Sequence, residues 1–130
     1  MGIYLTVIGK DFDATSFIKQ TNIKPDSIWI NARTKGVSNP HSGFSMITSS
    51  ADFNDFKLQV KDTIKFLNKH KEKLKYIKLT KEIQTATLTF AVQSQIEKKG
   101  IHSAFFPREL IRLAGELLLD IEITLFSMEV

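Results

Sequence analysis

Cysteine is absent from this chain of 130 residues, proline occurs only three times and glycine only six times. Without thiols the chain forms neither disulfides nor zinc–thiolate sites, and a reducing cytoplasm is the compartment that this composition favours. The glycines form no phosphate-cradling or dinucleotide-binding motif. No apolar run approaches the roughly 18 residues of a membrane span, and the N-terminus lacks the features of a secretory signal peptide. We therefore expect a cytoplasmic protein without a cofactor.

Length and hydrophobic content fit a single domain over residues 1–130. Hydrophobic residues make up 42% of the chain, and a chain of this size buries roughly two-thirds of the surface that it exposes when unfolded. The core therefore needs no disulfide or bound metal ion to be stable. The formal net charge is +4, and the lysines are concentrated between residues 52 and 81, so the basic character is local.

Hydrophobic periodicity indicates where strands and helices lie. The expected strands cover residues 3–8, 27–30, 43–48, 75–80, 84–94 and 119–126, and the expected helices cover residues 14–20, 51–69 and 107–117. The order is therefore β-α-β-β-α-β-β-α-β. We expect an α+β fold with a single, mostly antiparallel sheet and three helices gathered on one face. Because both ends of the chain read strand, helix, strand, the order also permits a ferredoxin-like pseudo-repeat.

Two aspartates, Asp11 and Asp13, flank Phe12 before the first expected helix. If Asp13 is the N-cap, Phe12 and Phe17 occupy the two positions of a hydrophobic staple. A catalytic or metal-binding role would need further converging ligands, and none lies nearby in the sequence. The histidines have no metal-ligand spacing either. We therefore expect a helix cap, no metal site and no catalytic residue.

The longest expected helix carries four lysines at a spacing of four, here called the lysine row: Lys57, Lys61, Lys65 and Lys69. The spacing of four stacks them along one side of a helix, where like charges repel slightly. One interpretation is a solvated face that is partly relieved by Asp62 and Glu72. The other is a surface that binds an anionic partner: an acidic protein, nucleic acid or an anionic membrane. Because we find no nucleic-acid-binding motif, we favour an acidic protein.

The segment of residues 31–43 is expected to be the one long loop. It brings Arg33, Lys35 and His41 next to Trp29 in the sequence. Long loops in compact domains are often functional, and a tryptophan with basic neighbours is typical of a binding hot spot. Alternatively, Trp29 belongs to the core and the loop has no role. These four residues join the lysine row as candidate binding residues.

Several short motifs carry a family resemblance. They are Gly9-Lys10-Asp11-Phe12-Asp13 after the first strand, Pro25 ahead of Trp29, the strand at Phe44, and the terminal Leu119-Asp120-Ile121-Glu122-Ile123. In these motifs the chain resembles the bacterial domain-of-unknown-function 4279 family over nearly its whole length. It departs from the pattern where INARTKG follows Trp29 and where Phe44 replaces a frequent tryptophan. The resemblance implies a bacterial origin and one compact domain, but no established activity.

These observations together favour a small, non-catalytic protein-interaction module, of which an immunity or antitoxin-type protein is one version. A homo-oligomer is compatible with this interpretation. The alternative is a nucleic-acid or anion binder that uses the lysine row. An enzyme is the least expected class, because no set of catalytic residue types converges in the sequence.

Overall fold

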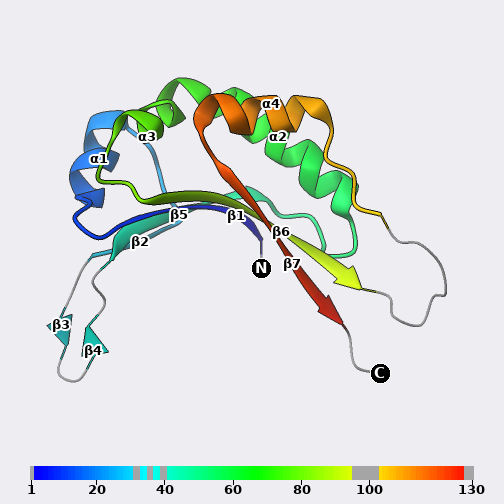
Figure 1. Cartoon of the computed structure of the whole chain (residues 1–130), viewed down its shortest axis with the longest axis horizontal. Helices are drawn as coiled ribbons and strands as arrows, with labels where there is room; N and C mark the ends of the chain where they lie inside the picture. The colour runs from blue at the N-terminus through cyan, green and yellow to red at the C-terminus, as the bar shows by residue number, and fades with distance from the viewer. Residues whose placement is uncertain (1, 31–32, 35–36, 39–40, 95–102, 128–130) are drawn as a thin grey trace.

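The computed structural model describes residues 2–30, 33–34, 37–38, 41–94 and 103–127. Its elements in chain order are β1 (Ile3–Gly9), α1 (Ala14–Thr21), β2 (Ser27–Trp29), β3 (Arg33–Thr34), β4 (Val37–Ser38), β5 (Ser42–Ser49), α2 (Phe56–Leu74), α3 (Tyr76–Leu79), β6 (Thr85–Ser94), α4 (Arg108–Leu117) and β7 (Asp120–Ser127). The helices lie over one face of an open five-stranded sheet (Figure 1). The α+β class with a single main sheet is thus confirmed.

The order of strands in the sheet is β2-β5-β1-β6-β7. The central strand β1 pairs antiparallel with β5 and β6, β2 pairs antiparallel with β5, and only β6 and β7 are parallel. The prediction of a mostly antiparallel sheet is therefore confirmed. In the unit β1-α1-β2 the two strands are separated by β5, whereas β6 and β7 on either side of α4 are direct neighbours. The two ends of the chain consequently differ in topology, despite their similar order of elements.

The core lies between the sheet and the helices. In β1, Ile3, Leu5 and Val7 are buried and alternate with partly exposed residues. The register places Leu5 beside Met46 of β5 and Leu88 of β6. Apolar residues on the helix-facing side therefore meet across neighbouring strands, as the alternation in the sequence predicted. The helices complete this core with Val60, Leu67, Leu74, Leu110, Leu113 and Leu117.

The expected strand at residues 75–80 is wrong, because these residues form α3. Lys75, which ends α2, keeps a right-handed helical backbone with φ −59° and ψ −23°. Leu74 and Ile77 are both buried, and a spacing of three places them on one face of a helical turn. A strand would have buried Ile77 and Leu79 together, yet Leu79 is exposed. The chain therefore contains one short helix more and one strand fewer here than we expected.

The long helix α2 begins and ends later than expected. Its N-cap is Asp55, whose carboxylate accepts the N–H of Leu58 at 3.1 Å, and neither serine near residue 50 caps it. The helix then continues to Leu74 rather than ending at residue 69. The apolar stripe alone did not reveal where the helix starts, since Phe53 fits the same spacing as Phe56.

The expected loop at residues 31–43 contains a second, small ladder. β3 and β4 pair antiparallel, with Arg33 opposite Ser38 and Thr34 opposite Val37. This pair projects away from the main sheet, on the side opposite the helices (Figure 1). A ladder this short has too few residues for a detectable period, which explains why the sequence indicated only a loop.

One buried side chain of α2 completes the sheet. β6 extends beyond the last residue that pairs with β1, so the backbone of Ala91 has no strand neighbour on that side. Gln59, which is fully buried, takes this place: its side-chain nitrogen donates to the Ala91 carbonyl at 2.9 Å, and its Oε1 accepts the Ala91 N–H at 3.2 Å. The same nitrogen also donates to the Asp52 carbonyl at 3.0 Å. Gln59 thus joins α2, β6 and the loop before α2.

Replacing Gln59 by leucine should destabilise the protein strongly. Gln59→Leu leaves the buried backbone groups of Ala91 without partners, at a cost of about 2 to 4 kcal/mol in the free energy of unfolding. Urea denaturation followed by circular dichroism measures this change. The control is Gln20→Leu, because Gln20 is exposed on α1 and its replacement should change stability by no more than about 0.5 kcal/mol. Equal stability of the two variants would show that the Gln59 bonds are not needed.

Candidate functional site

A groove of about 720 Å³ opens between the first turns of α2 and the segment leading into α4. Phe56, Val60 and Ile64 line it from α2, and Phe105 and Pro107 line it from the other side. Its polar lining residues are Asn54, Asp55, Lys57, Lys61, Ser103 and Glu109. An apolar groove with a few charged groups on its rim is the usual form of a binding site.

The far wall of the groove contains Phe105, and the adjacent Phe106 holds this segment against the core. Phe106 packs edge-to-face against Phe56, with ring centroids 5.2 Å apart, and against Phe90 at 5.4 Å. Phe105, by contrast, is 77% exposed although it lines the groove. Pro107 follows in an extended conformation and precedes the first residue of α4. Phe106 thus anchors the segment, while Phe105 presents an apolar ring to solvent at the edge of the groove.

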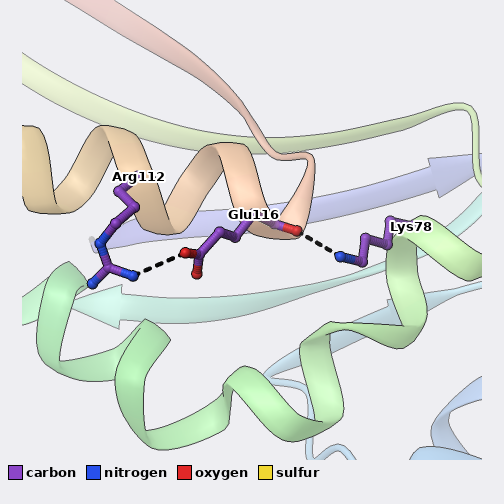
Figure 2. A network of polar contacts seen from close by, with 3 residues as sticks. All are labelled: Lys78, Arg112 and Glu116. Atoms are coloured by element: carbon purple, nitrogen blue, oxygen red, sulfur yellow. Dashed lines mark hydrogen bonds and ion pairs between the residues drawn. The ribbon is translucent and has the colours of Figure 1, made fainter.

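The C-terminal end of α4 is held by a small polar network. Lys78 of α3 donates to the Glu116 carbonyl at 2.9 Å, and Arg112 pairs with the Glu116 carboxylate at 3.0 Å (Figure 2). The lysine satisfies a carbonyl at the negative end of the helix, which is a favourable place for a cation. The residues are exposed, so the ion pair itself contributes little to stability. We interpret the network as a structural contact between α3 and α4 rather than a binding site.

The structure divides the lysine row between two hollows. Lys57 and Lys61 line the groove beside α4. Lys65 and Lys69 line a separate hollow of about 380 Å³, which lies between α2 and the end of β5 and also contains His70. Residues spaced by four advance by about 40° around a helix at each step. The row therefore crosses the exposed face of α2 from one flank to the other, and its four residues do not form a single site.

None of these four lysines has an ion-pair partner in the described part of the chain, where the ion pairs are Lys75–Glu72 and Arg112–Glu116. The two acids expected to relieve the row are engaged elsewhere. Asp62 accepts the Ser49 hydroxyl at 2.7 Å, and Glu72 pairs with Lys75. The positive charges of Lys57 and Lys61 are therefore available to a bound molecule at the groove.

His70 does not extend this positive surface. Its ring packs against Phe66 with centroids 4.6 Å apart. Burial, followed by the charges of Lys69 and Lys73, lowers the pKa of His70 below its ordinary value of 6.5. The imidazole is consequently neutral at pH 7, and the hollow beside β5 gains no charge from it.

The loop candidates lie away from the groove. Trp29 is opposite Gly43 in the register of β2 and β5, and its ring lies so close that a Cβ on Gly43 would be 2.8 Å from it. By strand alternation this is the face of the sheet without helices, where Trp29 is half-buried. Arg33 belongs to β3, His41 is exposed just before β5, and Lys35 lies outside the described residues. The seven candidates that the structure describes thus do not gather at one place.

Asp13 at the start of α1 has the expected structural role. The Asp13 carboxylate accepts the N–H of Ser16 at 3.0 Å and the Ser16 hydroxyl at 2.9 Å, and these bonds lower the pKa of Asp13. The rings of Phe12 and Phe17 meet edge-to-face at 5.4 Å, as expected for a hydrophobic staple. Among the described residues, no group of acids and histidines could hold a metal ion. Among the helices of the described residues, none is long and apolar enough to cross a membrane.

Sequence reasoning found Lys57 and Lys61 but missed the groove that they border. Its other wall is formed by Phe105 and Pro107, which lie far away in the sequence. The signal that could have revealed this wall is the pair of phenylalanines directly before a proline at the start of a helix. One of two adjacent aromatic residues in such a segment generally faces outward, because both cannot point into the same core.

The depressed pKa of His70 makes stability depend on pH. Below about pH 6.5 the unfolded chain binds a proton at this site before the folded chain does, so the free energy of unfolding should decrease as the pH falls from 6.5. An NMR titration of the ring should give a pKa below 6.5, and Lys69→Gln should raise it. Lys57→Gln, a change in the same helix but far from His70, should not. A pKa at or above 6.5 would contradict the assigned burial.

The chain matches the sequence model of the family described as "Domain of unknown function (DUF4279)" over residues 1–127. Neither the curated proteins nor the solved structures gave a match. The match confirms the resemblance read from the short motifs and covers nearly all of the sequence, and the chain therefore belongs to the DUF4279 family.

Proposed function

We propose that this protein is a non-catalytic interaction module that binds an acidic segment of a partner protein in the groove between α2 and α4. The observation that carries this proposal is the combination of an apolar lining with two lysines, Lys57 and Lys61, that have no acidic partner among the described residues. A segment with apolar side chains between acidic ones would bury the former in the groove and place the latter beside the lysines.

The two acids of the groove do not oppose this assignment, because each has a role in its own helix. Asp55 caps α2 through its bond to the N–H of Leu58. Glu109 lies in the first turn of α4, where the helix dipole favours a negative charge. Their charges are therefore partly compensated within the fold, whereas Lys57 and Lys61 have no ion-pair partner among the described residues.

The groove offers little support for an enzyme. The described hydrogen bonds join no two of its lining side chains, so there is no nucleophile paired with a base. Its charged groups are lysines and acids that lie on a rim around aromatic and aliphatic residues. This arrangement favours binding through apolar contact and charge complementarity.

A peptide-display selection on the intact protein tests the proposal. Enriched peptides should combine leucine or phenylalanine with aspartate or glutamate. The double variant Lys57→Glu/Lys61→Glu should weaken the best peptide by about tenfold or more, since two favourable contacts become repulsive. Isothermal titration calorimetry measures this change. The matched control is Lys65→Glu/Lys69→Glu, which alters the same charges on the same helix but faces the other hollow, and it should leave the affinity within about threefold. Selection without an acidic apolar consensus would contradict the proposal.

Nucleic acid is the alternative ligand, because the whole row of four lysines lacks acidic partners in the described chain. A duplex oligonucleotide is the appropriate probe. Binding through the row would weaken alike in both double variants and would fall with salt at a log–log slope of about −0.9 for each neutralised phosphate. Equal weakening of oligonucleotide binding in both double variants would replace the groove proposal with nucleic-acid binding through the row. An affinity that falls only in Lys57→Glu/Lys61→Glu would favour the groove.

Four finer assignments accompany this proposal. We place the module in the cytoplasm on the basis of its cysteine-free composition, and we assign it a bacterial origin on the basis of the family resemblance. An immunity or antitoxin-type role is one version of the module. Fractionation of the native cells, and identification of the crosslinked native partner, test the location and the role. The expected ferredoxin-like pseudo-repeat paired the two ends of the chain, which differ in topology. We propose instead that it consists of β1-α1-β2 and β5-α2-β6, because the strands of each unit enclose a strand of the other. Superposition of the two units in an experimental structure tests this equivalence.

A further inference from the structure

The outer edge of β7 is unpaired in the described chain. β7 lies at one end of the sheet and pairs only with β6. No backbone hydrogen bond from the described loops reaches its other edge. Its eight residues contain neither proline nor lysine, which often protect an exposed strand, and its two charged residues, Asp120 and Glu122, both lie in its first half. A long edge of this kind is a template for a further strand.

At two places inside the sheet, a side chain binds the backbone of a strand that extends past its shorter neighbour. Beyond the short strand β2, the N–H of Ile47 in β5 is bound by the Asp26 carboxylate at 2.7 Å. Beyond the end of β1, Gln59 binds both backbone groups of Ala91 in β6. No such side-chain bond is found along β7 among the described residues, and the other outer strand of the sheet, β2, is only three residues long, so β7 is the longer of the two outer edges.

Apolar side chains surround the open edge. In β7 itself, Ile123 is 39% exposed and Leu125 is 69% exposed, and both lie on the helix-facing side, in register with Phe90 and Val92 of β6. Ile111 of α4 is also exposed. Helical periodicity places it roughly 140° around α4 from Glu116, which contacts Lys78 of α3, and roughly 160° from Glu109, which lines the groove beside α2. Ile111 therefore lies on the flank of α4 that faces away from α2 and α3. Backbone hydrogen-bonding groups and an apolar strip thus coincide at this edge.

The sequence of β7 is complementary to itself. Around Ile123, apolar residues at 121 and 125 alternate with Glu122 and Thr124. In an antiparallel pair of two copies centred on Ile123, residue 121 of one copy lies opposite residue 125 of the other, and Glu122 lies opposite Thr124. A register centred on Glu122 would place two carboxylates opposite each other, which is unfavourable.

We propose that two copies of this chain associate through antiparallel pairing of their β7 strands about a two-fold axis at Ile123, which joins their sheets into one. The strip formed by Ile111, Ile123 and Leu125 meets its counterpart beside the paired strands. This interface is isologous and closed, so association stops at two copies. It uses none of the residues of the groove and is therefore independent of the proposed function.

The interface is modest in size. One strand and a few apolar side chains from each copy bury less than the roughly 1,200–2,000 Å² of a standard interface. We therefore expect a dissociation constant on the order of 10 to 100 µM rather than nanomolar affinity. Sedimentation equilibrium over a concentration range around these values should show the mass rising from one chain of 14.8 kDa to that of two chains. A single-chain mass up to about 1 mM would overturn the proposal.

A matched pair of variants locates the interface. Leu125→Lys places a charge in the proposed apolar strip and should raise the dissociation constant by about tenfold or more. Leu79→Lys is the control, because Leu79 is also 69% exposed but lies on α3, and it should leave the constant within about twofold. Neither change removes a buried group, so both variants should keep the wild-type circular dichroism. Dimerisation that Leu125→Lys leaves intact, or that both variants weaken alike, would overturn the assignment to β7.

The absence of cysteine from the chain permits a direct test of the register. In Ile123→Cys the two introduced thiols face each other across the proposed axis, at the Cα separation of about 4.5 to 5.5 Å found in antiparallel pairs, which a disulfide accommodates. Mild oxidation should convert most of the protein to a covalent dimer at concentrations near the dissociation constant. Leu79→Cys should crosslink only slowly. Equal crosslinking rates for the two variants would overturn the proposed pairing.

Discussion

The contact of Gln59 with β6 fixes the position of α2, and the candidate binding site depends on that position. The side-chain amide occupies the place of a missing strand beside Ala91 and also binds the loop before the helix. Phe56 and Val60, on neighbouring positions of the helix, are thereby held against β6 and form part of the groove. Lys57 and Lys61 belong to the same two turns, so the buried amide also determines where these charges meet solvent.

The sequence predicted best those features whose physical cause is local. The cap at Asp13 and the staple of Phe12 and Phe17 depend on residues within one turn, and the alternation in β1 is visible in a short window. The segment at residues 75–80 was misread because its burial is decided by Leu74 in the preceding helix, not by its own alternation. The groove was missed for a related reason, since its two walls meet only after the chain has folded. The two lysines were found, but not what lies opposite them.

The geometry of the helix changes the meaning of the lysine row. Read as a sequence, four lysines at equal spacing form one basic surface. On a helix with 3.6 residues per turn, the same spacing leads them obliquely across the exposed face, and they border two different hollows. A partner that contacts all four lysines must therefore extend across the exposed face of α2, whereas a partner bound in the groove contacts only Lys57 and Lys61. This distinction separates an extended polyanion from a compact acidic segment.

Helix α4 stands between the two proposed surfaces and keeps them apart. One flank, with Glu109, faces the groove beside α2, while Ile111 is exposed on the opposite flank. Its buried residues fix it to the core, and Lys78 holds its C-terminal end (Figure 2). A partner bound in the groove would therefore leave β7 free to pair. Two copies joined through β7 would present two grooves on the helix side of one continuous sheet, and a partner carrying two acidic segments would bind such a pair more tightly than a single copy, because the second contact becomes intramolecular.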